Sequence, residues 1–177
     1  MIPDDARALL AGLLNDPGVA VIGLGNRDRA DDGAGIEIAG RMKSAFSGRI
    51  FIEPEQGAES AVLELLDDER FHHVLFIDAV DFKAEPGTIR LFGIGDADDF
   101  LPAFSTHQAP VGLLMRLLSE RGKKCHLFGI QPGSTEIFGD MTESVRTAIL
   151  ELNEKVIGEI DIEAPRRPLR GIKLSYL

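Results

Sequence analysis

Two spacings of apolar residues alternate along the chain. Apolar residues three and four positions apart predict helices, and short runs of aliphatic and β-branched residues predict strands. Two of the predicted helices cover residues 4–14 and 58–66. Three more are predicted from apolar stripes. The first stripe is Ile36, Ala39, Gly40 and Met42, the second is Val111, Leu114, Met115 and Leu118, and the third is Val145, Ile149, Leu152 and Val156. The predicted strands lie at residues 19–24, 49–53, 73–77 and 124–130, with a further turn and strand at 85–92.

The strand at 73–77 indicates the kind of sheet. Residues 74–77 are all apolar, so both faces of this strand are expected to be covered, as in a parallel sheet between two helical layers. The few residues between this strand and the one ending at Phe92 are too short for a helical crossover, so one strand is expected to run antiparallel. The predicted fold is therefore a three-layer α/β/α sandwich with about five strands, mostly parallel and twisted, with one antiparallel strand.

Polar residues suggest where these elements begin and end. Asp31 or Asp32 is placed to cap the helix that follows the first strand, and residues 105–106 are placed to cap a later helix. Asp140 and Glu143 have the spacing of a capping box before the last helix. Asp78 is expected to end the central strand.

Length and composition fit one globular domain. The 177 residues are 44% hydrophobic and 27% charged, values typical of a folded soluble domain. We expect a single domain over residues 1–163. The segment 164–177 contains four basic residues and no acidic ones, so it is predicted to be a basic tail on the surface.

The charge and the single cysteine exclude several classes of function. Lys and Arg number 19 against 29 Asp and Glu, a net charge of −10, which disfavours binding to nucleic acid or to an anionic membrane surface. Cys125 is the only cysteine, so neither an intrachain disulfide nor a thiolate zinc cage can form. With an acidic N-terminus and no long apolar run, a cytoplasmic location is expected.

The glycines after the first strand resemble two familiar motifs incompletely. A dinucleotide-binding fingerprint would place a third glycine at position 28, where Asp28 stands and would face a pyrophosphate. The same Gly-x-Gly-Asn letters occur in peptidyl-tRNA hydrolases, but Arg27 follows here where that family usually has proline. Both motif interpretations are weak, and a strand-to-loop turn that needs close backbone approach explains the glycines without either.

Acidic residues follow two of the predicted strands. Asp31 and Asp32 lie in the loop after the first strand, and Asp78 follows the central one, so all are expected at the carboxyl edge of the sheet, where α/β folds bind ligands. Each carboxylate could instead cap a neighbouring loop. His107 stands near a predicted helix start, where the helix dipole keeps imidazole neutral and able to bind a metal. Two carboxylates and one imidazole from three loops would leave coordination positions open.

The other histidines are expected to have structural roles. His72 and His73 are adjacent, as are Cys125 and His126. Neighbouring side chains on a strand point to opposite faces, so neither pair is expected to chelate a metal.

Several short blocks together resemble the hydrogenase maturation endopeptidases, which trim the large subunit of nickel–iron hydrogenases. They occur in the family's order at 21–26 (Val-Ile-Gly-Leu-Gly-Asn), 31–35 (Asp-Asp-Gly-Ala-Gly), 76–79 (Phe-Ile-Asp-Ala), 86–90 (Pro-Gly-Thr-Ile-Arg), 105–108 (Ser-Thr-His-Gln) and 128–132 (Phe-Gly-Ile-Gln-Pro). The resemblance also implies an antiparallel fourth strand.

The resemblance implies that Asp32, Asp78 and His107 are the catalytic and nickel-contacting residues, with Asp31 beside the site. It implies no permanent cofactor: the nickel would be supplied by the partner, a hydrogenase large-subunit precursor, whose C-terminal extension is removed. Two mechanisms stay open: nickel polarises the scissile carbonyl, or a carboxylate activates water while nickel only positions the substrate. We favour the second, with Asp32 or Asp78 as general base. The alternative is a binding module that inspects nickel loading without cutting.

Two segments depart from the family pattern. Charged residues occupy positions 27–29, where the family often has apolar ones, and residues 53–57 lack the family's Gly-Thr signature. These differences concern the choice of hydrogenase partner more than the chemistry.

Overall fold

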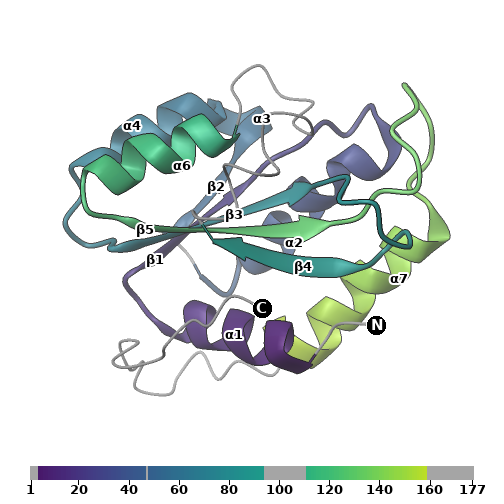
Figure 1. The fold of residues 1–177 in the computed structure, drawn as a ribbon, viewed down its shortest axis with the longest axis horizontal. Helices are drawn as coiled ribbons and strands as arrows, with labels where there is room; N and C mark the ends of the chain where they lie inside the picture. Colours follow the sequence, from purple (N-terminus) through teal and green to yellow (C-terminus); the bar gives the residue numbers. More distant parts are fainter. Residues whose placement is uncertain (1–3, 47, 94–110, 159–177) are drawn as a thin grey trace.

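The structure is a computed structural model. It describes residues 4–46, 48–93 and 111–158. These residues form one five-stranded sheet between two helical layers (Figure 1). The elements in chain order are α1 (Asp4–Asn15), β1 (Val19–Gly23), the 3-10 turn η1 (Ala30–Gly33), α2 (Ala34–Met42), β2 (Ile50–Ile52), α3 (Glu53–Gln56), α4 (Ala58–Leu66), β3 (His73–Ala79), β4 (Ile89–Gly93), α6 (Val111–Glu120), β5 (Lys124–Ile130), α7 (Glu143–Leu152) and the π-helical turn η2 (Asn153–Ile157).

The sheet confirms the predicted fold class. Its strand order is β2-β1-β3-β5-β4, and β4 alone is antiparallel, pairing with β5 from Ile89 opposite Ile130. Every residue of β1 and β3 is buried, because helices cover both faces, as the apolar run at 74–77 predicts.

Two apolar clusters lie on opposite faces of the sheet. One joins alternate residues of the central strands to α1, α2, α7 and η2. The other joins the remaining strand residues to α4 and α6. Figure 1 shows α4 and α6 together on one side of the strands, with α1 and α7 on the other.

Helix α2 lies unusually close to the sheet at its first turn. A Cβ on Gly35 would lie 2.2 Å from the Ile77 carbonyl oxygen and 2.5 Å from that of Leu24. Only glycine allows this approach. The contact fixes the helix and the turn η1 that precedes it against the carboxyl ends of β1 and β3.

Three local predictions are wrong. The residue before α2 is Gly33, and neither Asp31 nor Asp32 caps that helix. The N-cap residue of α7 is Thr142 and not Asp140, and the Thr142 side chain makes no capping hydrogen bond, so the predicted capping box does not form. In the predicted apolar stripe of α2, Gly40 is exposed and Ile38 is buried instead.

The central strand continues past its expected end. Asp78 lies within β3 and pairs with Gly129 of β5. The ladder extends because β5 offers partners as far as Ile130, opposite Ala79, so a single buried carboxylate does not terminate it.

Some expectations fall on other parts of the chain. His107, the predicted cap at 105–106 and the basic tail at 164–177 lie outside the described residues. Within the described ranges, no helix combines the length and the apolar character needed to cross a membrane.

Candidate active site

The strand order creates a switch point between β1 and β3. From β1 the chain crosses through α2, on one face, to β2 at the sheet edge; it then returns through α4, on the other face, to β3. In open α/β sheets, a crevice forms outside the carboxyl ends of the two strands from which helices depart to opposite faces. Asp32 and Asp78 both belong to segments at this point.

Asp32 is held by the loop that leaves β1. Its backbone carbonyl accepts a hydrogen bond from the Asn26 N–H at 3.2 Å. Gly25 has φ of +136°, and a Cβ there would lie 2.0 Å from the Asp32 carbonyl oxygen, so only glycine fits. The Asp32 residue is 1% exposed. The Gly-x-Gly-Asn motif therefore positions the backbone of Asp32.

Asp78 reaches the same edge from β3 and is 2% exposed. Its neighbour Ile77 pairs with Gly23, the last residue of β1. The Ile77 carbonyl accepts a hydrogen bond from the Leu24 N–H at 2.9 Å. The structure thus brings two of the predicted residues, Asp32 and Asp78, to the carboxyl ends of neighbouring strands.

The third predicted residue, His107, lies outside the described residues. In the part of the chain that the structure describes, no three His, Cys, Asp or Glu side chains are grouped to hold a metal ion. Asp32 and Asp78 would therefore need a further ligand, from this chain or from a substrate, to bind one.

Asp31 has a structural role that distinguishes it from Asp32. It is fully buried. Its carboxylate accepts hydrogen bonds from the N–H groups of Gly133 (2.7 Å), Ser134 (3.0 Å) and Thr142 (2.6 Å), and from the Thr142 hydroxyl (2.8 Å). These bonds tie the loop after β5 to η1. Because the Asp31 carboxylate already accepts four hydrogen bonds from this loop, its role is structural. Asp32 is therefore the candidate catalytic residue of the two.

Gln131 organises the other loop at this edge. Its side-chain oxygen accepts hydrogen bonds from the N–H groups of Phe82 and Ala84, and its side-chain amide donates to Asp81 Oδ1 at 3.0 Å. The side chain is nearly buried. Its partners hold the segment between β3 and β4 beside the last residues of β5.

Glu53 is a third carboxylate at the same edge, and the sequence argument missed it. It directly follows β2, and its Oε2 accepts a hydrogen bond from the Gly25 N–H at 2.9 Å. Its position after a strand is the same signal that singled out Asp78. The contact ties the strand-end loop of β1 to that of β2, which gives Glu53 a positioning role.

The histidines pair across strands. His73 Nδ1 lies 2.9 Å from His126 Nε2, with the rings stacked, and both residues are buried. This pair lies at the amino ends of β3 and β5, at the opposite edge from Asp78. Desolvation by burial lowers both pKa values to about 4, with smaller contributions from His72 and Lys124 to His73 and from His73 and Lys124 to His126. The prediction of structural roles considered only adjacent residues and did not foresee this contact.

Cys125 is unsuited to be a nucleophile. The thiol is buried among apolar residues on the α4–α6 face, and burial raises its pKa to about 11. Reactive cysteines have lowered pKa values and some exposure.

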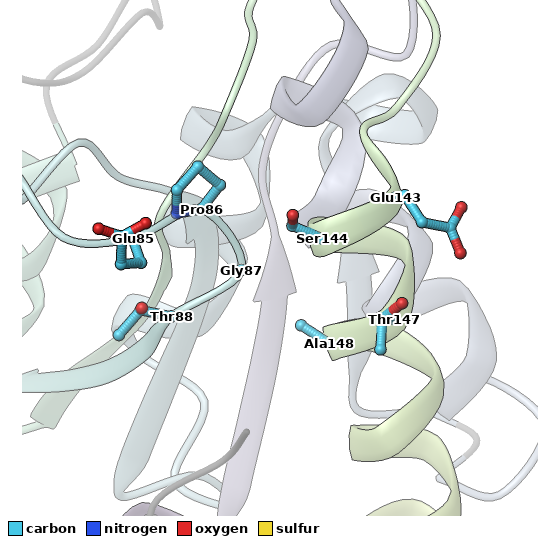
Figure 2. Close-up of a pocket in the computed structure, with 8 residues that line it drawn as sticks. All are labelled: Glu85, Pro86, Gly87, Thr88, Glu143, Ser144, Thr147 and Ala148. Carbon is cyan, nitrogen blue, oxygen red and sulfur yellow. The ribbon is translucent and has the colours of Figure 1, made fainter.

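A separate pocket of about 410 Å³ opens between the turn before β4 and the first turns of α7. Figure 2 shows Pro86 and Gly87 on one side and Ser144, Thr147 and Ala148 on the other. It lies near the same sheet edge, because β4 begins opposite the end of β5. Neither Asp32 nor Asp78 lines it, so it is distinct from the candidate site at the switch point.

Several known proteins match this chain over most of its length. The family model HycI, described as hydrogenase maturation protease, matches residues 57–159, more than half of the chain. The hydrogenase 3 maturation protease of Escherichia coli is 28% identical over 137 residues, which are 76% of this chain and 86% of that protein. The hydrogenase expression/formation protein HupD of Thiocapsa roseopersicina is 28% identical over 164 residues, 86% of this chain and 73% of that protein.

The fold agrees with these matches. The crystal structure of a nickel–iron hydrogenase maturation protease, HycI of Thermococcus kodakarensis, superposes with a TM-score of 0.69 at 27% identity. The match covers 85% of this chain and 97% of that one. The chain described here belongs to the hydrogenase maturation protease family, and so to the hydrolases.

Proposed function

We propose that this protein is an endopeptidase that removes the C-terminal extension of a nickel–iron hydrogenase large-subunit precursor after nickel has been inserted. Family membership supports the general activity, and the printed names of the relatives point to hydrogenase as the partner. The observation that carries the proposal is the placement of two buried carboxylates, Asp32 and Asp78, at the switch point of the sheet.

The proposed substrate brings its own metal. Asp32 and Asp78 supply oxygen ligands and His107 supplies an imidazole nitrogen, a donor set that suits a divalent nickel ion. Three protein ligands leave positions for groups of the precursor. Binding the nickel and the peptide together would hold the scissile bond in one place, which lowers the entropic part of the barrier.

A carboxylate at this edge would also move protons. We favour Asp32 or Asp78 as general base: one oxygen takes a proton from the attacking water, and the same proton is then given to the nitrogen of the leaving peptide. Nickel then serves to position the substrate. Both carboxylates are nearly buried, and charges in such surroundings interact more strongly than in water.

Mass spectrometry of the precursor tests the proposal. Nickel-loaded large-subunit precursor is incubated with the parental protein and with Asp32→Ala, Asp78→Ala and His107→Ala, while binding is followed in parallel. The parental protein is expected to release one short C-terminal peptide, and the variants are expected to lose cutting while remaining folded. Stable binding of intact precursor by the parental protein would favour the alternative, a non-cleaving checkpoint module. Cutting by all three variants at the parental rate would show that the site is assigned wrongly.

A further inference from the structure

The loop after β5 carries two large apolar side chains on its surface. Ile137 is 61% exposed and Phe138 is 84% exposed. Single exposed apolar residues are common on soluble proteins, and Leu63 on α4 is one example, at 63%. Two consecutive ones, at the tip of a loop next to a candidate active site, call for a separate explanation.

The backbone of Phe138 is in an unfavourable conformation. Its φ is +59°, in a left-handed region that is unfavourable for a residue with a Cβ and that glycine or asparagine normally occupies. Phe138 buries almost none of its side chain to offset this cost. Strain at an exposed aromatic residue is more often found where the residue serves binding than where it serves folding.

The tip is rigidly connected to the candidate site. The Phe138 N–H donates a hydrogen bond to the Asp28 carbonyl, and a Cβ on Gly139 would lie 3.4 Å from that of Ala30. Both ends of the loop are bound to the Asp31 carboxylate, through Gly133 and Thr142. Asp31 is the neighbour of Asp32, so the tip is held in a fixed relation to it.

The surroundings of the tip are acidic. Asp28, Glu136 and Asp140 are exposed around it. Of the nearby cations, Arg27 is paired with Glu37 at 3.4 Å and Arg29 is half-buried, so acidic groups predominate at the surface. An apolar tip with an acidic border fits a recess that is apolar at its centre and basic at its rim.

We propose that the Ile137–Phe138 tip is a docking anchor that inserts into an apolar recess with a basic rim on the hydrogenase precursor, beside the segment being cut. This inference rests on the proposed function and adds a second contact to it. The loop is hydrogen-bonded to Asp31 in the same turn as Asp32, so the proposed anchor would bind the precursor on the side of the site where this turn lies. The tip supplies affinity, whereas the carboxylates supply cutting.

The test measures binding and cutting separately, with nickel-loaded precursor as the probe. Phe138→Gly is expected to weaken precursor binding about ten-fold or more, as for an aromatic anchor, and to leave the cutting rate at saturating precursor unchanged. Because glycine relieves the left-handed strain, the variant should be at least as stable as the parent. Loss of binding together with retained or increased stability would not arise from a merely structural role.

Ile137→Ser is a second variant that does not alter the strained position, and Leu63→Ala is the matched control on a distant helix. Ile137→Ser should also weaken precursor binding. Glu136→Lys should weaken it because a lysine would be repelled by the basic rim of the recess. Leu63→Ala should leave binding unchanged. Cutting by the parent together with unchanged binding by Phe138→Gly and Ile137→Ser would overturn the inference and leave the proposed function standing. Absence of both binding and cutting by the parent would instead reject the proposed function itself. Self-association of the parent that Phe138→Gly abolishes, with precursor binding unchanged, would assign the tip to a second copy and overturn the inference.

Discussion

Asp31 accepts two hydrogen bonds from Thr142, one from the backbone N–H and one from the hydroxyl, although the two residues are 111 positions apart in the chain. The same carboxylate binds Gly133 and Ser134. Removing it would leave the N–H groups of Gly133, Ser134 and Thr142 without this acceptor. Asp31→Ala is therefore expected to lower the free energy of unfolding by roughly 3 kcal/mol or more, as measured by urea denaturation.

Thr142→Val is a milder change to the same contact, because it removes only the hydroxyl hydrogen bond to Asp31 and keeps the one from the Thr142 N–H. We expect a loss of about 1 kcal/mol. The double variant should lose less than the sum of the two single losses, because the residues share one interaction. Additive losses would mean that Asp31 and Thr142 stabilise the protein independently.

Asp32, the next residue in the chain, should behave in the opposite way to Asp31. Asp32→Asn conserves the shape of the side chain and removes its ability to take a proton. Release of the C-terminal peptide is expected to fall about 10²–10⁴-fold, the range for loss of a general base, while the urea midpoint stays near that of the parent. Loss of stability equal to that of Asp31→Ala, with cutting retained, would assign Asp32 to the structure and not to the chemistry.

Two glycines of α2 provide a matched pair. Gly35→Ala would place a methyl group against the Ile77 and Leu24 carbonyl oxygens, so the helix must move away from the sheet and carry Asp32 with it. We expect a loss of more than about 2 kcal/mol of stability and reduced cutting.

Gly40→Ala is the control on the same helix. A Cβ at Gly40 meets nothing within 4 Å, so alanine should stabilise the helix by about 0.5–1 kcal/mol and leave cutting unchanged. Equal effects of the two substitutions on the thermal midpoint would show that the close approach at Gly35 is not what positions α2.

The His73–His126 pair predicts how stability depends on pH. Burial lowers both pKa values to about 4 from an ordinary 6.5. Between pH 4 and 6.5 the unfolded chain binds more protons than the folded one, so stability rises with pH across this range and is lost as pH falls. Protonating the pair on acidification should cost roughly a few kcal/mol of stability in total. The charged or titratable neighbours are Asp16, His72 and Lys124.

The double variant His73→Leu/His126→Leu removes both rings together and leaves no unpaired nitrogen. Urea midpoints measured from pH 4 to 7.5 should then vary much less than those of the parent. A double variant with the parental pH dependence would place the acid sensitivity elsewhere in the protein.

Much of the fold could be predicted because it depends on local patterns. The bounds of α4 and β5 agree with the apolar runs that predict them, and the antiparallel strand follows from a link too short for a crossover. The strand-end rule also places Asp32 and Asp78 at one edge.

Two contacts that the sequence pattern did not predict join residues distant in sequence. Asp31 was expected to cap its own helix but binds a loop more than 100 residues away. The contact between His73 and His126 depends on the register of β3 and β5, in which His73 faces Lys124 and Leu75 faces His126. Sequence pattern shows that each strand exists, but it does not show how two strands align.

The central claim is that Asp32, Asp78 and His107 surround one position for a nickel ion brought by the substrate. A crystal of the protein soaked in nickel or cadmium tests it most directly, through the anomalous signal of the metal. The proposed site predicts one ion with Asp32 and Asp78 oxygens and a His107 nitrogen bound at about 2.0–2.4 Å. Coordinates in which these three side chains point to different faces, or an ion bound only elsewhere, would contradict it.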